Sequence, residues 1–273
     1  MFSLSHKKRI ITGFILTAAL AGALAAGGWI LRLLVSFTAV LALGEFFQMC
    51  WPGRTNTDCK LAGLLLCAVM LLGSGVCFGS GGLLFLLCLG SLYAGLRFLF
   101  LYAKGDDKAA LQENLLLLFG LLYIPLSLQF AVNLSRSEQI LVILGAIASD
   151  IGAYYAGSNF GRHKICPRVS PNKSWEGFWG GIALDMPATA LCGSLASPPG
   201  LEHIPFWGWA LAGLAFSLAA QAGDFFESAL KRAAGVKDSS RLLPGHGGIL
   251  DRLDSIIFVL SFYALLKTLC APV

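Results

Sequence analysis

Long apolar segments recur along almost the whole of this 273-residue chain, and they constrain its fold more than any other feature. A bilayer core is crossed by an α-helix of roughly 20 apolar residues. Segments of that length fall near residues 10–27, 29–50, 61–79, 82–103, 115–132, 139–157, 178–196, 204–226 and 254–271. Charged residues make up only 13% of the chain, against about 25% in a soluble domain. The sequence therefore predicts an all-α, polytopic transmembrane helical bundle with about nine spans.

The basic residues predict the orientation of this bundle. If the N terminus is cytoplasmic, sixteen Lys and Arg residues fall in cytoplasmic loops and only Arg136 falls in a loop on the opposite side. Short loops rich in Lys and Arg stay in the cytoplasm, so we expect a cytoplasmic N terminus. The net charge of +5 then reflects this basic face, and we expect no nucleic-acid partner.

Two parts of one continuous membrane domain differ in character. Residues 1–138 are Leu/Ala/Gly-rich spans with short loops, which we interpret as scaffold helices, and Glu45 is the acid within their spans. Residues 139–273 have long basic loops, and acids enter their spans at Asp150, Asp185 and Asp224. Ionisable groups in a membrane usually mark functional sites, so we expect the second part to be catalytic. We interpret Glu45 and Asp185 mainly as interhelical polar contacts.

Two helix ends carry the acids that are best placed for a site. One helix face has polar groups at i, i+3, i+4 and i+7, namely Asp224, Glu227, Ser228 and Lys231. Asp251, Asp254 and Ser255 follow at the start of the last predicted helix. Magnesium is usually held by one or two carboxylates together with substrate phosphates and water, and paired ions can act on both oxygens of a displacement.

Other interpretations remain open for these acids and for Asp150. They could simply pair with the neighbouring bases Lys231, Arg232 and Arg252. Asp150, in the segment SDIGAYY, is a candidate further acid of the same centre, although a buried, hydrogen-bonded aspartate is the rival interpretation.

The segment Leu243-Pro-Gly-His-Gly-Gly248 predicts a phosphate site. Its glycines, Gly245, Gly247 and Gly248, permit positive φ and leave the backbone uncovered. Such a turn before a helix presents N–H groups to an anion. His246 could carry a proton, donate to phosphate or serve the turn, and we favour binding because a phosphate nucleophile is already ionised at neutral pH.

A second cytoplasmic loop, residues 170–177, combines Lys173 with Trp175. Lys173 is suited to phosphate. Trp175 is either an interfacial anchor or a surface for a base or acyl chain.

The combined motifs resemble one family. S-x-x-K-R-x4-K-D, L-P-G-H-G-G and D-R-x-D follow one another from Ser228 to Asp254, after SDIGAYYAG, RVSP, K-x-W-E-G and GDFFES. This order is similar to that of the phosphatidate cytidylyltransferases, or CDP-diacylglycerol synthases, from about residue 145 to 258. The chain departs from the family pattern at Ser158, Asn172, Ser174 and Ser239-Ser240.

This resemblance implies an enzyme that transfers the cytidylyl group from CTP to phosphatidic acid, forming CDP-diacylglycerol and pyrophosphate. It implies a Mg²⁺-dependent paired metal centre whose second ion is unidentified, and a homodimer in the inner membrane of a bacterium. The metal-binding acids of the family fall on Asp224 and Asp251, with Asp150 and Asp254 in support. Its other polar positions fall on Ser228, Lys231, Arg232, Lys237, Asp238, His246 and Arg252.

For the reaction we expect a phosphatidate oxygen to attack the α-phosphorus of CTP at the cytoplasmic face. Lys231, Arg232 and Lys237 would balance phosphate charge. One rival is another CTP-dependent lipid enzyme, such as a polyprenol or phytol kinase. The other is an ion-coupled transporter, against which stands the gathering of polar groups at one membrane face.

Overall fold

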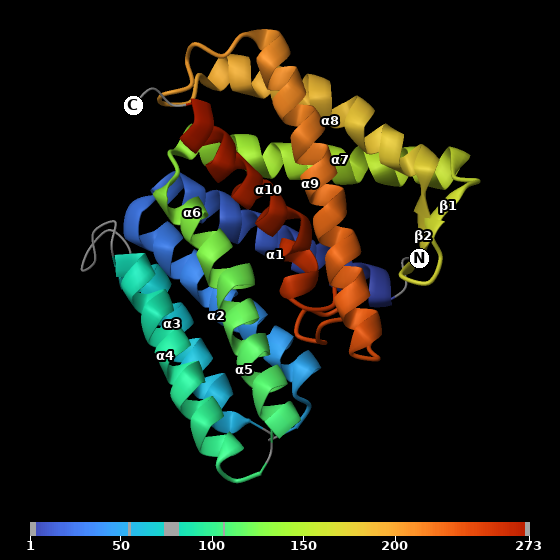
Figure 1. Cartoon of the computed structure of the whole chain (residues 1–273). Coiled ribbons are helices and arrows are strands. Elements are labelled where there is room, and N and C mark those ends of the chain that lie inside the picture. Colours follow the sequence, from blue (N-terminus) through green and yellow to red (C-terminus); the bar gives the residue numbers. More distant parts are fainter. Residues whose placement is uncertain (1–3, 54–55, 74–81, 106, 271–273) are drawn as a thin grey trace. The chain divides into compact units, whose positions relative to one another are not determined.

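The computed structural model describes residues 4–53, 56–73, 82–105 and 107–270 (Figure 1). Within them the chain is predominantly helical, as predicted, because a helix satisfies its own backbone hydrogen bonds in an apolar setting. The elements are α1 (Leu4–Ala26), α2 (Gly28–Cys50), α3 (Thr57–Gly73), α4 (Gly82–Tyr102), α5 (Asp107–Leu121), the π-helical turn η1 (Leu122–Leu126), α6 (Ser127–Asn133), α7 (Arg136–Phe160), β1 (Lys164–Cys166), β2 (Ser170–Ser174), α8 (Trp175–Ala196), α9 (Phe206–Ala233) and α10 (Leu250–Cys270).

Five helical stretches in the described part of the chain are long and apolar enough to cross a membrane. They are α2, α4, the stretch Leu111–Asn133, α7 and α10. The other predicted spans coincide with α1, α3, α8 and α9, although residues 74–79 of the third predicted span lie outside the described residues. The structure thus supports a multi-pass membrane protein.

Contacts divide the chain into two compact units. The first unit comprises residues 1–133 and 238–251, and the second comprises residues 134–237 and 252–273. The loop segment from Asp238 therefore groups with the N-terminal helices, although it lies among the C-terminal ones in sequence.

The first unit is built on apolar packing of α2, α3 and the α5–η1–α6 stretch. Phe46, Phe47 and Leu117 are fully buried in it. A proline has no N–H for the helical ladder, and Pro125 lies in the π-helical turn η1 that joins α5 to α6. The one arginine of α4, Arg97, is neutralised at its Nε by Asp58 at 2.6 Å.

The second unit is built on packing among α7, α8 and α9; in Figure 1, α7 and α8 run alongside each other and α9 crosses them. α7 begins with a capping box between Ser135 and Glu138. A Cβ atom on Gly152 of α7 would collide with the backbone oxygen of Gly180 in α8, so only glycine allows the two helices to approach this closely.

A short antiparallel hairpin, β1–β2, connects α7 to α8. The sequence predicts a cytoplasmic loop here, and the hairpin is the one strand pair among the described residues. Ser174 at its end caps α8, because its Oγ accepts the N–H of Gly177 at 3.2 Å. The hairpin thereby fixes the start of α8.

Candidate functional site

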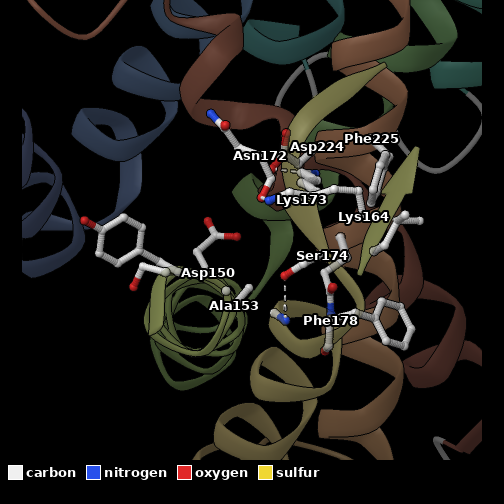
Figure 2. Close-up of a pocket in the computed structure, with 15 residues that line it drawn as sticks. Asp150, Ala153, Lys164, Asn172, Lys173, Ser174, Phe178, Asp224 and Phe225 are labelled. Atoms are coloured by element: carbon white, nitrogen blue, oxygen red, sulfur yellow. Dashed lines mark hydrogen bonds and ion pairs between the residues drawn. The ribbon is translucent and has the colours of Figure 1, made fainter. Parts of the chain in front are cut away.

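A cavity of about 540 Å³ lies within the second unit, lined by α7, the β1–β2 hairpin, the start of α8 and α9. Figure 2 shows Asp150, Lys173 and Asp224 facing this space from three different elements. Its polar lining comprises Asp150, Tyr154, Ser158, Lys164, Asn172, Lys173, Ser174, Gln221 and Asp224. Three of the departures from the family pattern, Ser158, Asn172 and Ser174, therefore line the cavity.

Lys173 and Asp224 form the central charge pair of this cavity. Nζ of Lys173 lies 2.7 Å from Oδ2 of Asp224 and 4.0 Å from the centre of the Phe225 ring. The ring face attracts a cation, so the ammonium is held between a carboxylate and an aromatic face. This arrangement places a positive group from the hairpin at the predicted metal-binding acid of α9.

Three of the four predicted metal-binding acids gather in the second unit. The charge of Asp224 acts on Asp150 and on Asp254, so the three carboxylates lie within electrostatic range of each other. Ser255 forms a hydrogen bond with Asp150, and the charges of Lys173 and Arg252 reach this acid as well. Because like charges repel at such range, the cluster favours a cation among its carboxylates.

The C-terminal end of α9 carries contacts between residues four apart, in agreement with one polar helix face. Ser228 Oγ lies 3.4 Å from Oδ1 of Asp224, and Lys231 forms an ion pair with the fully buried Glu227. Lys231, predicted to balance phosphate charge, thus has a carboxylate partner. Arg232 donates through Nε to the carbonyl of Val169 at 3.3 Å.

The fourth predicted metal ligand, Asp251, belongs to the first unit. Its Oδ2 accepts the N–H of Gly248 at 2.7 Å and the N–H of Ser239 at 3.0 Å. Gly245 and Gly247 both have a φ of 80°, which confirms the predicted need for glycine in this turn. Asp224 and Asp251 lie in different units, so a cation shared between them stays a prediction.

The other predicted residues differ in their exposure to solvent. Lys237, Asp238 and Arg252 are exposed. Trp175 is exposed at the start of α8, with its ring edge towards Phe178. Asp185 is fully buried and accepts a hydrogen bond from Thr189 of the same helix at 2.6 Å.

Several residues at these sites were not among the predicted site residues. Lys164 and Gln221 line the cavity, Glu227 pairs with Lys231, and Glu45 binds the loop before α10. The i, i+4 spacing of Glu227 and Lys231 could have predicted their ion pair from the sequence. No sequence pattern could have placed Lys164, because its position depends on the hairpin.

The residues fit a magnesium site of the kind completed by substrate. Among the described residues, no three His, Cys, Asp or Glu side chains form a group that could hold a metal ion by themselves. Magnesium commonly takes only one or two carboxylates and draws its other ligands from phosphates and water. The repelling carboxylates of Asp150, Asp224 and Asp254 meet that requirement.

The chain belongs to the cytidylyltransferase family, because the model of that family matches residues 7–270, nearly the whole sequence. Its curated relatives include several proteins named phosphatidate cytidylyltransferase. The chain is similar to that of Staphylococcus epidermidis, with 33% identity over 95% of this chain and 98% of the relative.

Two further relatives match over a shorter region. The phosphatidate cytidylyltransferase of Mycobacterium bovis is 40% identical over 144 residues, covering 51% of this chain and 45% of that protein. The one of Bacillus subtilis is 45% identical over 122 residues, covering 45% of this chain and 44% of the relative. In both comparisons the match spans less than half the length of the relative.

Proposed function

We propose that this protein transfers the cytidylyl group of CTP to phosphatidic acid, forming CDP-diacylglycerol and pyrophosphate. The observation that carries this proposal is the cavity of the second unit, where Lys173 meets Asp224 beside Asp150. A site for two phosphate-bearing substrates needs both a cation for phosphate and acids for a metal ion. The family and the relatives named phosphatidate cytidylyltransferase support the same assignment.

In the proposed reaction, a phosphate oxygen of phosphatidic acid attacks the α-phosphorus of CTP. The new P–O bond forms as the bond to the β-phosphate oxygen breaks, and pyrophosphate leaves with that electron pair. No general base is needed, because a phosphate monoester is already ionised near neutral pH. Lys173 binds phosphate oxygens, while Lys231, Arg232 and Lys237 balance the remaining charge.

Magnesium is the proposed cofactor, as a paired centre held by Asp224 and Asp251 with Asp150 and Asp254 in support. When bound, it stabilises the negative charge on the reacting phosphates. In the chain itself, the like charges of Asp150, Asp224 and Asp254 lie near enough to act on each other, which supports a cation among them. Lys173 supplies a positive charge at Asp224.

We further propose nine spans, a cytoplasmic N terminus and a site at the cytoplasmic face of the bacterial inner membrane. The sixteen-to-one distribution of Lys and Arg supports this orientation. A homodimer and contact with membrane lipids complete the proposal, and they rest on the family resemblance.

The test uses purified protein with phosphatidic acid, Mg²⁺ and CTP labelled at the α-phosphate. We expect label in the organic phase as CDP-diacylglycerol. Transfer of γ-label instead would identify a lipid kinase, and solute flux without CTP consumption would identify a transporter.

Variants Asp224→Asn and Asp251→Asn are expected to abolish this transfer while leaving membrane insertion intact, because each removes a carboxylate charge needed for the cation. Asp58→Asn is the matched control, since Asp58 pairs with Arg97 in the first unit and lines no part of the cavity. Near-normal turnover of either site variant would contradict the assignment.

A further inference from the structure

Glu45 of α2 is a buried acid whose hydrogen-bond donors, within the described residues, come from the loop before α10 and from the first residue of α10. Its side chain belongs to a residue that is only 7% exposed, inside a predicted span. Burying a carboxylate is costly unless it is paired or hydrogen-bonded. Within the described residues no Lys, Arg or His side chain forms an ion pair with it.

Four hydrogen-bond donors take the place of a cation. Oε1 of Glu45 accepts the hydroxyl of Ser240 at 2.6 Å and the N–H of Ile249 at 3.0 Å. Oε2 accepts the hydroxyl of Ser239 at 3.0 Å and the N–H of Leu250 at 2.8 Å. Because a carboxylate has about four acceptor positions, this one is fully used by a segment some 200 residues away in sequence.

Ser239 connects Glu45 to Asp251, the proposed metal ligand of the first unit. Its Oγ lies 3.0 Å from Oε2 of Glu45 and 2.9 Å from Oδ2 of Asp251. A hydroxyl has one proton to donate, so the two carboxylates share a single donor. Loss of Glu45 as an acceptor therefore changes the hydrogen bonding of Asp251 directly.

The glycine-rich turn is fitted around the same carboxylate. A Cβ atom on Gly248 would collide with Oγ of Ser239 and would lie 2.5 Å from Oε2 of Glu45. The turn itself is closed by Leu243 and Gly247, with the N–H of Leu243 donating to the carbonyl of Gly247 at 2.9 Å. The carboxylate of Glu45 therefore lies against the backbone that joins the turn to α10.

We propose that Glu45 is a positioning residue for nucleotide binding. Through Ser239 and the first N–H groups of α10, it holds Asp251 and the glycine-rich turn in the conformation that receives magnesium and the phosphates of CTP. This inference rests on the proposed function. It assigns to a helix of the predicted scaffold a direct part in organising the substrate site.

The first experiment measures binding separately from turnover. Thermal stabilisation of the purified protein by Mg²⁺–CTP gives a half-saturating concentration for the wild type, Glu45→Gln and Glu138→Gln. Glutamine keeps the shape but places an NH2 group against N–H donors, so we expect Glu45→Gln to raise this concentration by about tenfold.

Glu138→Gln is the matched control. Glu138 is another buried glutamate with several donors, but these are Ser135, Tyr263 and Lys267 in the second unit. We expect it to lower the melting temperature while keeping the Mg²⁺–CTP concentration within about twofold of the wild type. An equal effect of both variants on nucleotide binding would overturn the inference, because it would show a general loss of fold.

Kinetics and a second variant complete the test. The KM for phosphatidic acid should stay within about twofold in Glu45→Gln while that for Mg²⁺–CTP rises. Ser239→Ala removes only one hydroxyl and should reproduce this pattern, and the double variant should be no worse than the poorer single one. Additive effects, or unchanged nucleotide binding in both single variants, would overturn the inference.

The wild type separates this inference from the proposed function. If Mg²⁺–CTP stabilises it but no label reaches the lipid, the proposed function fails and the binding comparison still tests Glu45. If Mg²⁺–CTP does not stabilise the wild type, the positioning role is excluded.

Discussion

Lys173 of the hairpin forms an ion pair with Asp224 of α9. Its ammonium lies between the carboxylate of Asp224 and the ring of Phe225. An ammonium is a compact charge on a flexible stem, so it can turn from the carboxylate to a phosphate without moving the backbone. The sequence suggested phosphate binding for Lys173, but its pairing with Asp224 depends on the fold of residues 164–174.

Lys173→Met is expected to reduce kcat/KM for CTP by about a hundredfold, because it removes a positive charge from a partly enclosed phosphate site. Transfer of α-label at varied CTP concentration measures this loss. Lys104→Met is the matched control, since Nζ of Lys104 also lies over an aromatic ring, at 4.1 Å from the centre of Phe100, but lines no part of the cavity. A similar loss in both variants would contradict the role of Lys173.

Glu176 predicts a pH dependence outside the spans. A hydrogen bond from its own backbone N–H, together with one from His163, lowers the pKa of this carboxyl from 4.5 to about 2. The ionised form is therefore favoured by the folded state, and its stabilising effect is complete above pH 4.5. That effect is lost as the pH falls from 4.5 towards 2.

Glu176→Gln tests this pH dependence. The variant lacks the ionisable group, so its melting temperature should lie below that of the wild type at pH 6, and the difference should shrink as the pH falls towards 2. Thermal unfolding in detergent between pH 2 and 6 measures it. A difference that stays constant over this range would show that the carboxylate charge of Glu176 does not stabilise the folded state.

At the level of elements, α7 and α8 of the second unit pack against each other through glycines. Gly152→Ala is expected to destabilise the protein by about 1–3 kcal/mol, because the added methyl group collides with the oxygen of Gly180 and lies 2.9 Å from Cβ of Leu184. The melting temperature in detergent measures the loss. Gly95→Ala in α4 is the control, since its added methyl group meets nothing within 4 Å, and it should have little effect.

The helices were predictable from the sequence and the hairpin was not. Each predicted span coincides with a helix where the chain is described, because about 20 consecutive apolar residues need a self-satisfied backbone. The strands around Lys164 and Ser174 are three and five residues long and rich in polar groups. Such strands form through pairing and through contact with the helix ends, which leaves no periodic pattern to recognise.

The candidate site was predictable in composition and only partly in arrangement. The spacing of Asp224 and Ser228 on one helix face led directly to their contact. Asp150, Asp224 and Asp254 come together only because α7, α9 and α10 pack near one another. The sequence suggested this grouping because acids within predicted spans usually mark a shared site. The binding of Glu45 to Ser240 spans 195 residues and has no local signal.

At the level of the whole molecule, the proposed orientation has a direct test. Glu202, between α8 and α9, should face the outside, and Lys237, after α9, should face the cytoplasm, because α9 lies between them. In a background without the native cysteines, a membrane-impermeant maleimide should label Glu202→Cys in intact cells. It should label Lys237→Cys only after permeabilisation, and the reverse pattern would contradict a cytoplasmic N terminus.

The grouping of residues 238–251 with the N-terminal helices has a practical consequence for anyone seeking a minimal enzyme. A fragment from residue 139 onward would retain every signature motif of the family. It would nevertheless leave the serines and amides before α10 without the carboxylate that receives them. Truncation at residue 139 would remove Glu45 from the segment that it binds. Co-expression of both halves would keep Glu45 and that segment together in a split protein.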